Sequence, residues 1–316
     1  MNSRRRAAVG AAGLAAAATL AMFGPAAAAA DPERASTASD ALPPGGRTVY
    51  VTNSADDGGT PNVARFTINN AGTLNPVDTV DAGARARGMA FTPDLRFAYV
   101  ASTTANRVDM YRIGPNGELT RFGAVETPSP LGIAIAPNGR TLYVVNAGTR
   151  MVSVFTVRPD GGLTLRQVVD TGAEATHDVA LTPDGRFLYV GHGLPTDTEP
   201  GVIIGFALRP DGSVGRDVAR VQIGIGGAET VITPNGRFVY VVHEITNDVY
   251  GFRIGRDGGL SPVPGSPVGG GDYTDSIVNT FTVAPDGNLR LLQTVKSQGR
   301  RPAFQSINVL PEGTQR

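Results

Sequence analysis

The sequence has no cysteine, no tryptophan and only three histidines among 316 residues. Without cysteine the chain forms no disulfide, so its stability has to come from an ordinary hydrophobic core. The 28 basic and 28 acidic residues balance, which leaves no basic excess for binding phosphates. There is no Gly-x-Ser-x-Gly element and no short metal-ligand spacing. We therefore expect no nucleic acid partner, no cofactor and no metal.

The first 30 residues differ from the rest of the chain. Three arginines, Arg4 to Arg6, precede an Ala/Leu/Gly-rich run to about Phe23, and small residues follow to Ala30. This order is typical of a cleavable export signal, and the apolar run is too short for a membrane span. The sequence predicts a secreted protein that uses the general or the twin-arginine route. Residues 31–43, rich in Pro, Ala, Ser and Thr, are predicted to be a flexible lead-in.

A repeated hairpin fills the rest of the chain. Its copies are AFTPDLRFAYVAS at 90–102, AIAPNGRTLYVVN at 134–146, ALTPDGRFLYVGH at 180–192, VITPNGRFVYVVH at 231–243 and the half-copy PPGGRTVYVTN at 43–53. The turn prolines, at 44, 93, 137, 183 and 234, are 49, 44, 46 and 51 residues apart. Such a period is the signature of equal structural units.

Each unit predicts four antiparallel strands. The x-Pro-Asp/Asn-Gly-Arg turn joins two arms rich in β-branched and aromatic residues, and a second hairpin such as VSVFTVRPDGGLT follows. Four strands make one blade of a β-propeller, so residues 44–316 are predicted to be one all-β propeller of six to seven blades. A solenoid is the alternative, but the units lack a capping repeat. Ring closure would pair residues 303–313, from the C-terminus, with residues 48–53.

One unit breaks the period. The turns of the second hairpins lie at Pro115, Pro159, Pro210, Arg256 and Pro285, so the last spacing is 29 where the others are 44 to 51. A first hairpin is missing near 268–276. The sequence predicts that this blade is incomplete.

All three histidines are predicted to lie at one end of the ring. In a four-stranded meander the first strand begins, and the second strand ends, on the face opposite the hairpin turns. We call this face the mouth. His192 and His243 end second strands, where other copies have Asn53, Ser102 and Asn146, and His177 begins a first strand.

Charged residues share these connections. They are the acids Glu174, Asp178, Glu229 and Glu244 and the bases Arg85, Arg87, Arg300 and Arg301. A concave site with groups that titrate near neutral pH is a candidate for chemistry or ligand binding. The alternative is that a histidine at a strand end only forms hydrogen bonds that fix a connecting loop.

The LYVVN or VYVTN strand joined to the Pro-Asp-Gly-Arg turn resembles the lactonase-type β-propellers, which include 6-phosphogluconolactonases and carboxymuconate cyclases. The resemblance covers residues 43–313. In that family one blade opens with His-x-His, and the next has Pro-Arg-His and ends its inner hairpin in Asn-Glu. Here His177 and Glu244 match, His243 stands at the Asn of the Asn-Glu pair, and Ala175, Ala228 and Glu229 replace the first histidine and the Arg-His pair.

The resemblance implies a lactonase, a carboxylic ester hydrolase, and together with the predicted export signal it leads us to expect an exported enzyme acting on an anionic sugar or organic-acid lactone at the mouth. Hydrolysis needs a base, an oxyanion donor and a proton for the leaving alkoxide. We assign Glu244 or His177 as the base and His243 and His192 as donors or acids. Arg87, Arg300, Arg301 and Glu229 would bind the substrate.

Two alternatives remain. One is a non-catalytic propeller that binds a glycan, peptide or protein at the mouth. The other is a zinc or calcium site among the three histidines and their carboxylates. In each case we expect a monomer.

Overall fold

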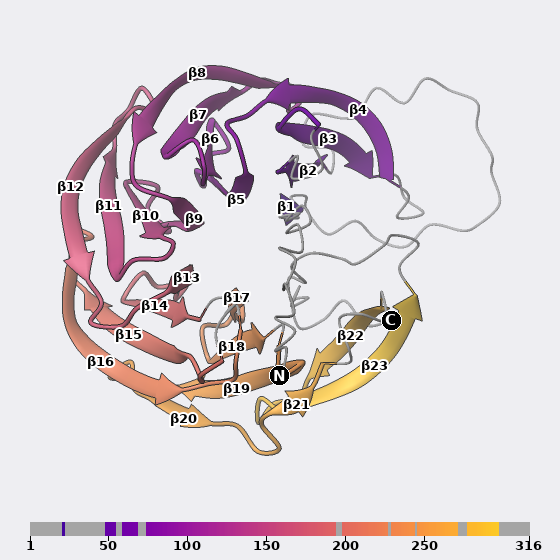
Figure 1. Ribbon diagram of the computed structural model, residues 1–316, viewed down its shortest axis with the longest axis vertical. Coiled ribbons are helices and arrows are strands. Elements are labelled where there is room, and N and C mark those ends of the chain that lie inside the picture. Colours follow the sequence, from indigo (N-terminus) through magenta and orange to yellow (C-terminus); the bar gives the residue numbers. More distant parts are fainter. Residues whose placement is uncertain are drawn as a thin grey trace, which may run out of the picture.

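The computed structural model describes residues 21–22, 48–54, 59–68, 74–193, 198–226, 229–243, 245–270 and 277–296. These residues form six antiparallel sheets that follow one another in chain order around a common axis (Figure 1). The described residues include no α-helix, and therefore no helix that is long and apolar enough to cross a membrane. The prediction of an all-β propeller is confirmed.

The first three sheets have four strands each. Sheet A is β1 (Ala21–Met22), β2 (Thr48–Asn53), β3 (Asn62–Ile68) and β4 (Leu74–Asp81); sheet B is β5 (Ala86–Phe91), β6 (Phe97–Ser102), β7 (Arg107–Ile113) and β8 (Leu119–Glu126); sheet C is β9 (Pro130–Ile135), β10 (Thr141–Asn146), β11 (Met151–Val157) and β12 (Leu163–Asp170).

The next three sheets differ in strand number. Sheet D is β13 (Thr176–Leu181), β14 (Phe187–His192), β15 (Val202–Leu208) and β16 (Val214–Gln222); sheet E is β17 (Glu229–Ile232), β18 (Phe238–His243), β19 (Asp248–Ile254), β20 (Leu260–Pro262) and β21 (Val268–Gly269); sheet F is β22 (Ile277–Val283) and β23 (Leu289–Lys296).

Sheet F lies where the sequence predicts an incomplete blade, and because residues 271–276 and 297–316 are not described, that incompleteness stays a prediction. Its described strands are β22 and β23, which form only a second hairpin. Part of the expected gap is occupied by β21, which pairs with β19 beyond the short β20. Residues 271–276 lie outside the described residues.

The strand beside β2 is β1, from the segment predicted to be an export signal. The sequence instead predicts that residues 303–313 pair with β2. Those residues lie outside the described ranges, so closure of the ring by the two termini stays a prediction.

The Pro-Asp-Gly-Arg turns have the expected geometry. Gly139, Gly185 and Gly236 are left-handed, with φ near +70°, a conformation that costs glycine little. In the copy without this glycine, Leu95 takes the same conformation at φ +54°. The repeated turn therefore closes the same hairpin in sheets B to E.

A tyrosine in each second strand ties its sheet to the next one. The hydroxyl of Tyr143 in sheet C donates to the carbonyl oxygen of Gly212 in sheet D at 2.7 Å. The same bond recurs from Tyr50 to Gly117, Tyr99 to Gly161, Tyr189 to Gly258 and Tyr240 to Gly287. These buried tyrosines join all six sheets in series, and we call them the tyrosine pins.

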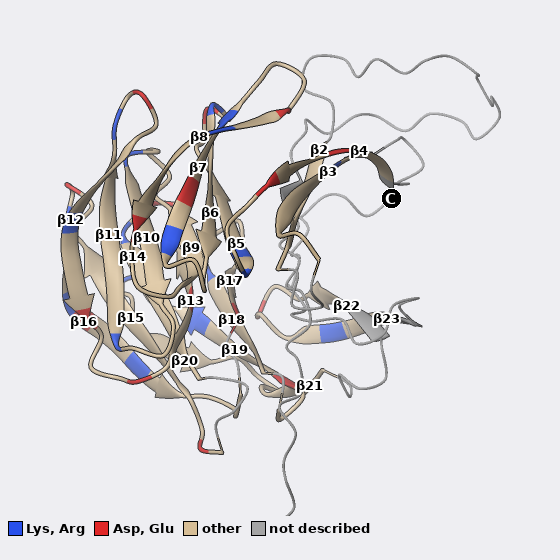
Figure 2. Ribbon diagram, turned by 45° about the horizontal axis from the view of Figure 1, so that its top comes forward, with Lys and Arg blue, Asp and Glu red and all other residues tan. Residues whose placement is uncertain are grey.

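The core lies between neighbouring sheets. One cluster joins Tyr143, Val154, Leu188 and Phe206 from sheets C and D, and equivalent clusters fill the other described boundaries. Charged residues of both signs are interspersed over the strands and turns (Figure 2). Packing between sheets thus fixes the positions of the innermost strands β5, β9, β13 and β17.

Candidate functional site

A residue with a positive φ precedes each of the innermost strands β5, β9, β13 and β17. The residue eight positions before each turn proline has a positive φ, namely Arg85, Ser129, Ala175 and Gly226, at 55°, 37°, 60° and 78°. The carbonyl oxygens of Arg85, Ser129 and Ala175 accept the N–H that follows the second strand, at 2.8 to 3.0 Å. Positive φ is unfavourable for residues other than glycine, so the sheets hold these connections in place at the mouth.

A β-bulge follows this connection in three sheets. The strand register shifts between Ala86 and Met89 in β5 and between Thr176 and Asp178 in β13. In the pairing of β9 with β10 it shifts between Val144 and Asn146 of β10. Bulges change the direction of side chains and are common beside active sites. Here they set the directions of Arg87 and His177.

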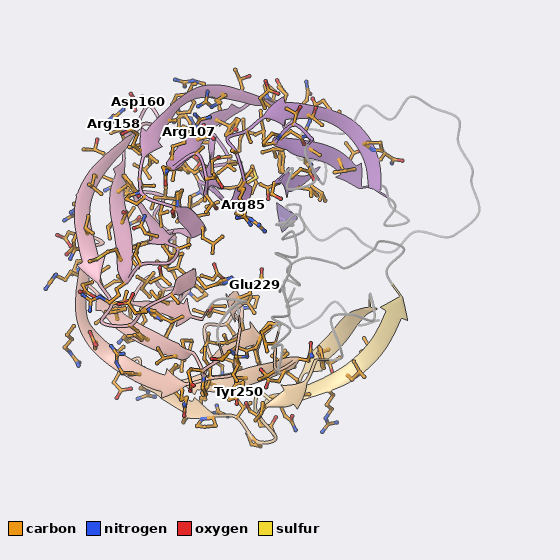
Figure 3. All side chains as sticks on the ribbon, viewed as in Figure 1. Arg85, Arg107, Arg158, Asp160, Glu229 and Tyr250 are labelled. Carbon is orange, nitrogen blue, oxygen red and sulfur yellow. The ribbon has the colours of Figure 1, made fainter. Side chains whose placement is uncertain are left out.

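Arg87 and His177 are both buried, with 3% and 4% of their surface exposed. The carbonyl oxygen of Arg87 accepts a hydrogen bond from Thr52 in β2. Strand β9 lies between β5 and β13, so one sheet separates Arg87 from His177. Glu229 is half-buried at the start of β17, and Figure 3 shows Arg85 and Glu229 near the ring axis.

Asp178 joins three innermost strands. Its Oδ2 accepts the N–H of Thr230 in β17 at 2.9 Å. Its Oδ1 lies against Gly132 in β9, where an added Cβ would collide with it. Burial raises the pKa of the carboxyl to about 6, although the N–H donors of Thr230 and Val179 oppose the rise. The sequence marks Asp178 only as a neighbour of His177, because its contacts lie 46 and 52 residues away.

Both ring nitrogens of His192 form hydrogen bonds within the protein. Its Nε2 lies 2.8 Å from Thr171 Oγ1, and its Nδ1 lies 3.1 and 3.2 Å from the carbonyl oxygens of Val190 and Val202. Burial lowers the pKa of the imidazole to about 4, so the ring is neutral at pH 7. Nδ1 then donates to a carbonyl and Nε2 accepts from the Thr171 hydroxyl. These contacts are those of a side chain that fixes a connecting loop.

His243 has a different environment. Its Nδ1 lies 2.9 Å from Asp248 Oδ1, and the Tyr250 ring packs nearly perpendicular to the imidazole at a centroid distance of 5.2 Å. The residue is 2% exposed. Its Nε2 has no hydrogen-bond partner in the described structure.

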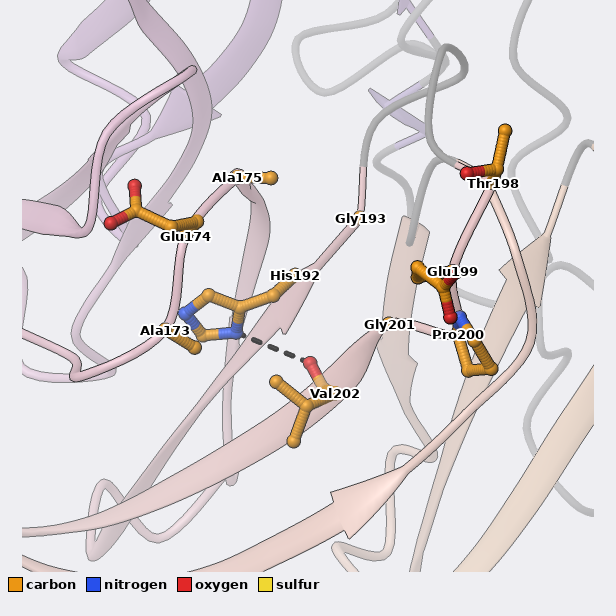
Figure 4. Close-up of a pocket in the computed structure, with 10 residues that line it drawn as sticks. All are labelled: Ala173, Glu174, Ala175, His192, Gly193, Thr198, Glu199, Pro200, Gly201 and Val202. Atoms are coloured by element: carbon orange, nitrogen blue, oxygen red, sulfur yellow. Dashed lines mark hydrogen bonds between the residues drawn. The ribbon is translucent and has the colours of Figure 1, made fainter.

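A cavity of about 440 Å³ lies beside His192 (Figure 4). Glu174, Thr198 and Glu199 supply polar groups around it. Its other lining residues are Ala173, Ala175, Gly193, Pro200, Gly201 and Val202. Of the predicted catalytic residues, His192 lines this cavity.

The structure brings the predicted residues together in two pairs of strands. Thr176, next to His177, pairs with His192, and Glu229 pairs with Val242, next to His243. Glu244, Arg300 and Arg301 lie outside the described residues. Within the described ranges no three His, Asp or Glu side chains gather as a metal site. The catalytic and binding roles of all these residues stay predictions.

The sequence model of a family described as Lactonase, 7-bladed beta-propeller matches residues 39–199, which are 161 of the 316 residues. The chain belongs to this lactonase family. It is similar to the 6-phosphogluconolactonase of Enterobacter sp. (strain 638), with 27% identity over 276 residues that cover 78% of each chain.

Two solved structures resemble this lactonase-family chain. A candidate 6-phosphogluconolactonase from Bacteroides uniformis aligns with a TM-score of 0.61 and 23% identity, over 71% of this chain and 68% of the other. The periplasmic gluconolactonase PpgL of Pseudomonas aeruginosa aligns with a TM-score of 0.57 and 20% identity, over 84% and 71%. These likenesses show the propeller fold. Against the seven blades of the family, the described residues form six sheets.

Proposed function

We propose that this chain is an exported lactonase that hydrolyses an anionic sugar or organic-acid lactone at the mouth. The observation that carries the proposal is the β-bulge in each of the innermost strands β5 and β13. Arg87 lies within the first bulge and His177 within the second. Membership of the lactonase family supports the same reaction.

The groups required for lactone hydrolysis are available in the chain. His177 or Glu244 would take the proton of the attacking water, and Arg87, with Arg300 or Arg301, would bind the substrate anion. Asp178 adds a carboxyl whose pKa of about 6 suits proton transfer near neutral pH. Arg85, which has a positive φ, immediately precedes β5, the strand that contains Arg87.

Export and a monomeric state belong to this proposal. The order of charged, apolar and small residues in the first 30 positions supports an export signal. The name of the Pseudomonas aeruginosa relative places that protein in the periplasm. Mass spectrometry of the protein collected from the medium or periplasm tests export, and we expect cleavage near Ala30. Full-length protein confined to the cytoplasm would contradict it.

A non-catalytic binding propeller is the second candidate. It is favoured by His192, whose two ring nitrogens are already bonded within the protein, and by Ala228 and Glu229, which replace the family's Arg-His pair. The same mouth would then hold a glycan, peptide or partner protein.

Proton release from a panel of sugar-acid and aromatic-acid lactones separates the two candidates. We expect turnover by the wild-type protein and its loss in His177→Ala and in Glu244→Gln. Arg87→Gln should raise KM for anionic lactones more than for neutral ones, since it removes a charge that binds the substrate. Absence of turnover by well-folded protein across the whole panel would favour the binding propeller.

A further inference from the structure

The last residue of each second strand forms a polar cluster with the third strand. Ser102 Oγ donates to Asp109, Asn146 accepts from Ser153, and Asn53 donates to Asn62. His243 follows the same rule through Asp248, whose Cα is its register partner. The histidine therefore occupies a position at which this fold otherwise uses a short polar side chain.

The connection before the innermost strand supplies another partner in three sheets. The backbone N–H of Gly83 donates to Asp109, Thr127 Oγ1 accepts from Asn146, and Thr171 Oγ1 bonds His192. In the connection that leads to sheet E, the residue that corresponds to Thr127 and Thr171 is Ile223, the first after the fourth strand. Gly224 follows it, and an added Cβ there would lie 2.9 Å from His243 Cγ. Neither residue carries a hydroxyl, and His243 Nε2 has no partner among the described residues.

Asp248 determines which nitrogen of His243 is basic. The carboxylate accepts the Nδ1 hydrogen at 2.9 Å, which places the lone pair of the neutral ring on Nε2. The perpendicular Tyr250 ring packs against the imidazole as a second contact. A buried acceptor with no hydrogen bond is unfavourable unless water or a ligand serves it. An imidazole fixed by a carboxylate, with its other nitrogen unused, is also the arrangement of a general base.

We propose that His243 is the general base of this site and that Asp248 is its positioning residue. This inference rests on the proposed lactonase function and deepens it. It differs from the expectation that His243 is a donor or an acid and that the base is Glu244 or His177. His243 ends β18, next to the pair formed by Glu229 and Val242, and so lies at the mouth.

The proposed hydrolysis needs only the lactone, one water molecule and the imidazole of His243. His243 Nε2 takes one proton from water as the water oxygen forms a bond to the lactone carbonyl carbon. The resulting tetrahedral intermediate breaks the ring C–O bond, and the leaving alkoxide receives the proton from the imidazolium. The product is the hydroxy acid, and the imidazole returns to its neutral form.

Two single substitutions test the roles of His243 and Asp248. His243→Asn retains a residue that the same position holds as Asn53 and Asn146, and it should lower kcat by about 100-fold or more. In Asp248→Asn the amide donates to Nδ1 and moves the ring proton to Nε2, so a similar loss is expected. The matched control is Ser153→Ala, which removes the third-strand partner of Asn146 in sheet C and should leave kcat unchanged.

The pH profile distinguishes a base from a structural residue. If His243 is the base, the acid limb of the wild-type kcat/KM profile disappears in His243→Asn, whereas a structural role would lower activity evenly at every pH. Full activity in His243→Asn, or an unchanged acid limb, would overturn the proposal.

Imidazole NMR tests the dyad without a lactone. The chain has only three histidines, so each ring can be assigned by substitution. We expect His243 to carry its proton on Nδ1 in the wild type and on Nε2 in Asp248→Asn. A wild-type Nε2–H tautomer would overturn the dyad. An Nδ1–H tautomer together with no turnover of any lactone would instead show that the proposed reaction is wrong while the dyad exists.

Discussion

Two buried groups make opposite contributions to stability in the same pH range. The pKa of His192 is lowered from 6.5 to about 4 by burial, so the unfolded chain binds this proton more readily than the folded protein. Its contribution to stability is fully present above pH 6.5 and is lost as the pH falls to about 4. At about 1.4 kcal/mol per pKa unit, the loss amounts to about 3 kcal/mol.

Asp178 has the reverse sign. Its pKa is raised from 3.8 to about 6 in the folded protein, so the folded state binds this proton more readily than the unfolded chain. Its contribution is fully present below pH 3.8 and is lost as the pH rises through 6, by about 3 kcal/mol. Between pH 7 and pH 4 the two groups nearly cancel, and we expect little net change from them in the wild type.

Single substitutions should expose each contribution. In Asp178→Asn, the unfolding free energy should fall by about 3 kcal/mol relative to wild type on going from pH 7 to pH 4. In His192→Asn it should rise by a similar amount over the same range, and the double variant should be flat again. Asn keeps an acceptor for the N–H of Thr230, so Asp178→Asn removes the titration and retains the bond.

Urea unfolding followed by far-UV circular dichroism measures these values, since the chain has no tryptophan. The control is Asp211→Asn, because the Ser213 hydrogen bonds hold the pKa of that carboxyl below its usual 3.8 and it does not titrate in the range studied. Curves for Asp178→Asn and His192→Asn that run parallel to wild type from pH 7 to pH 4 would refute the reasoning.

The packing of the sheets gives further predictions. Tyr143→Phe removes the pin to Gly212 and should destabilise the protein by about 1 to 3 kcal/mol, because a buried carbonyl loses its donor; an unchanged denaturation midpoint would contradict this. Gly212→Ala should cost at least about 1 kcal/mol, since φ is +83° and the new Cβ would collide with Thr141. Gly132→Ala should displace Asp178, and Asp178→Asn made in that background should then change the pH dependence of unfolding less than it does alone.

The repeat predicted the fold because its information is local. The turn at Pro183 specifies a hairpin from residues 180–192 alone, and the turn at Pro285 likewise predicted the hairpin of β22 and β23. The tyrosine pins could not be read in the same way. Tyr143 and Gly212 are 69 residues apart, and only the placement of one sheet against the next brings them together.

The candidate site shows the same division. The repeat predicted that His192 and His243 end second strands, as they do in β14 and β18, and that His177 lies near the start of a first strand, as it does in β13. That the three residues share one mouth stays a prediction. The hydrogen bonding of each imidazole could not be predicted from the repeat. Whether Nε2 is bonded depends on the first residue after the preceding fourth strand, which is Thr171 for His192 and Ile223 for His243. The bulges at Arg87 and His177 also arise from pairing and leave no mark in the hydrophobic pattern.

The tyrosine pins show which sheets support the candidate site residues. Each pin runs from a second strand to the next sheet, so sheets A to E hold sheets B to F. Within the described residues sheet F has no second strand, and therefore no pin toward sheet A. The described site residues lie on sheets B, D and E, and the pin from Tyr240 to Gly287 holds sheet F outside that group. The described pins that join sheets A to E therefore support Arg87, His177 and His243 without depending on sheet F.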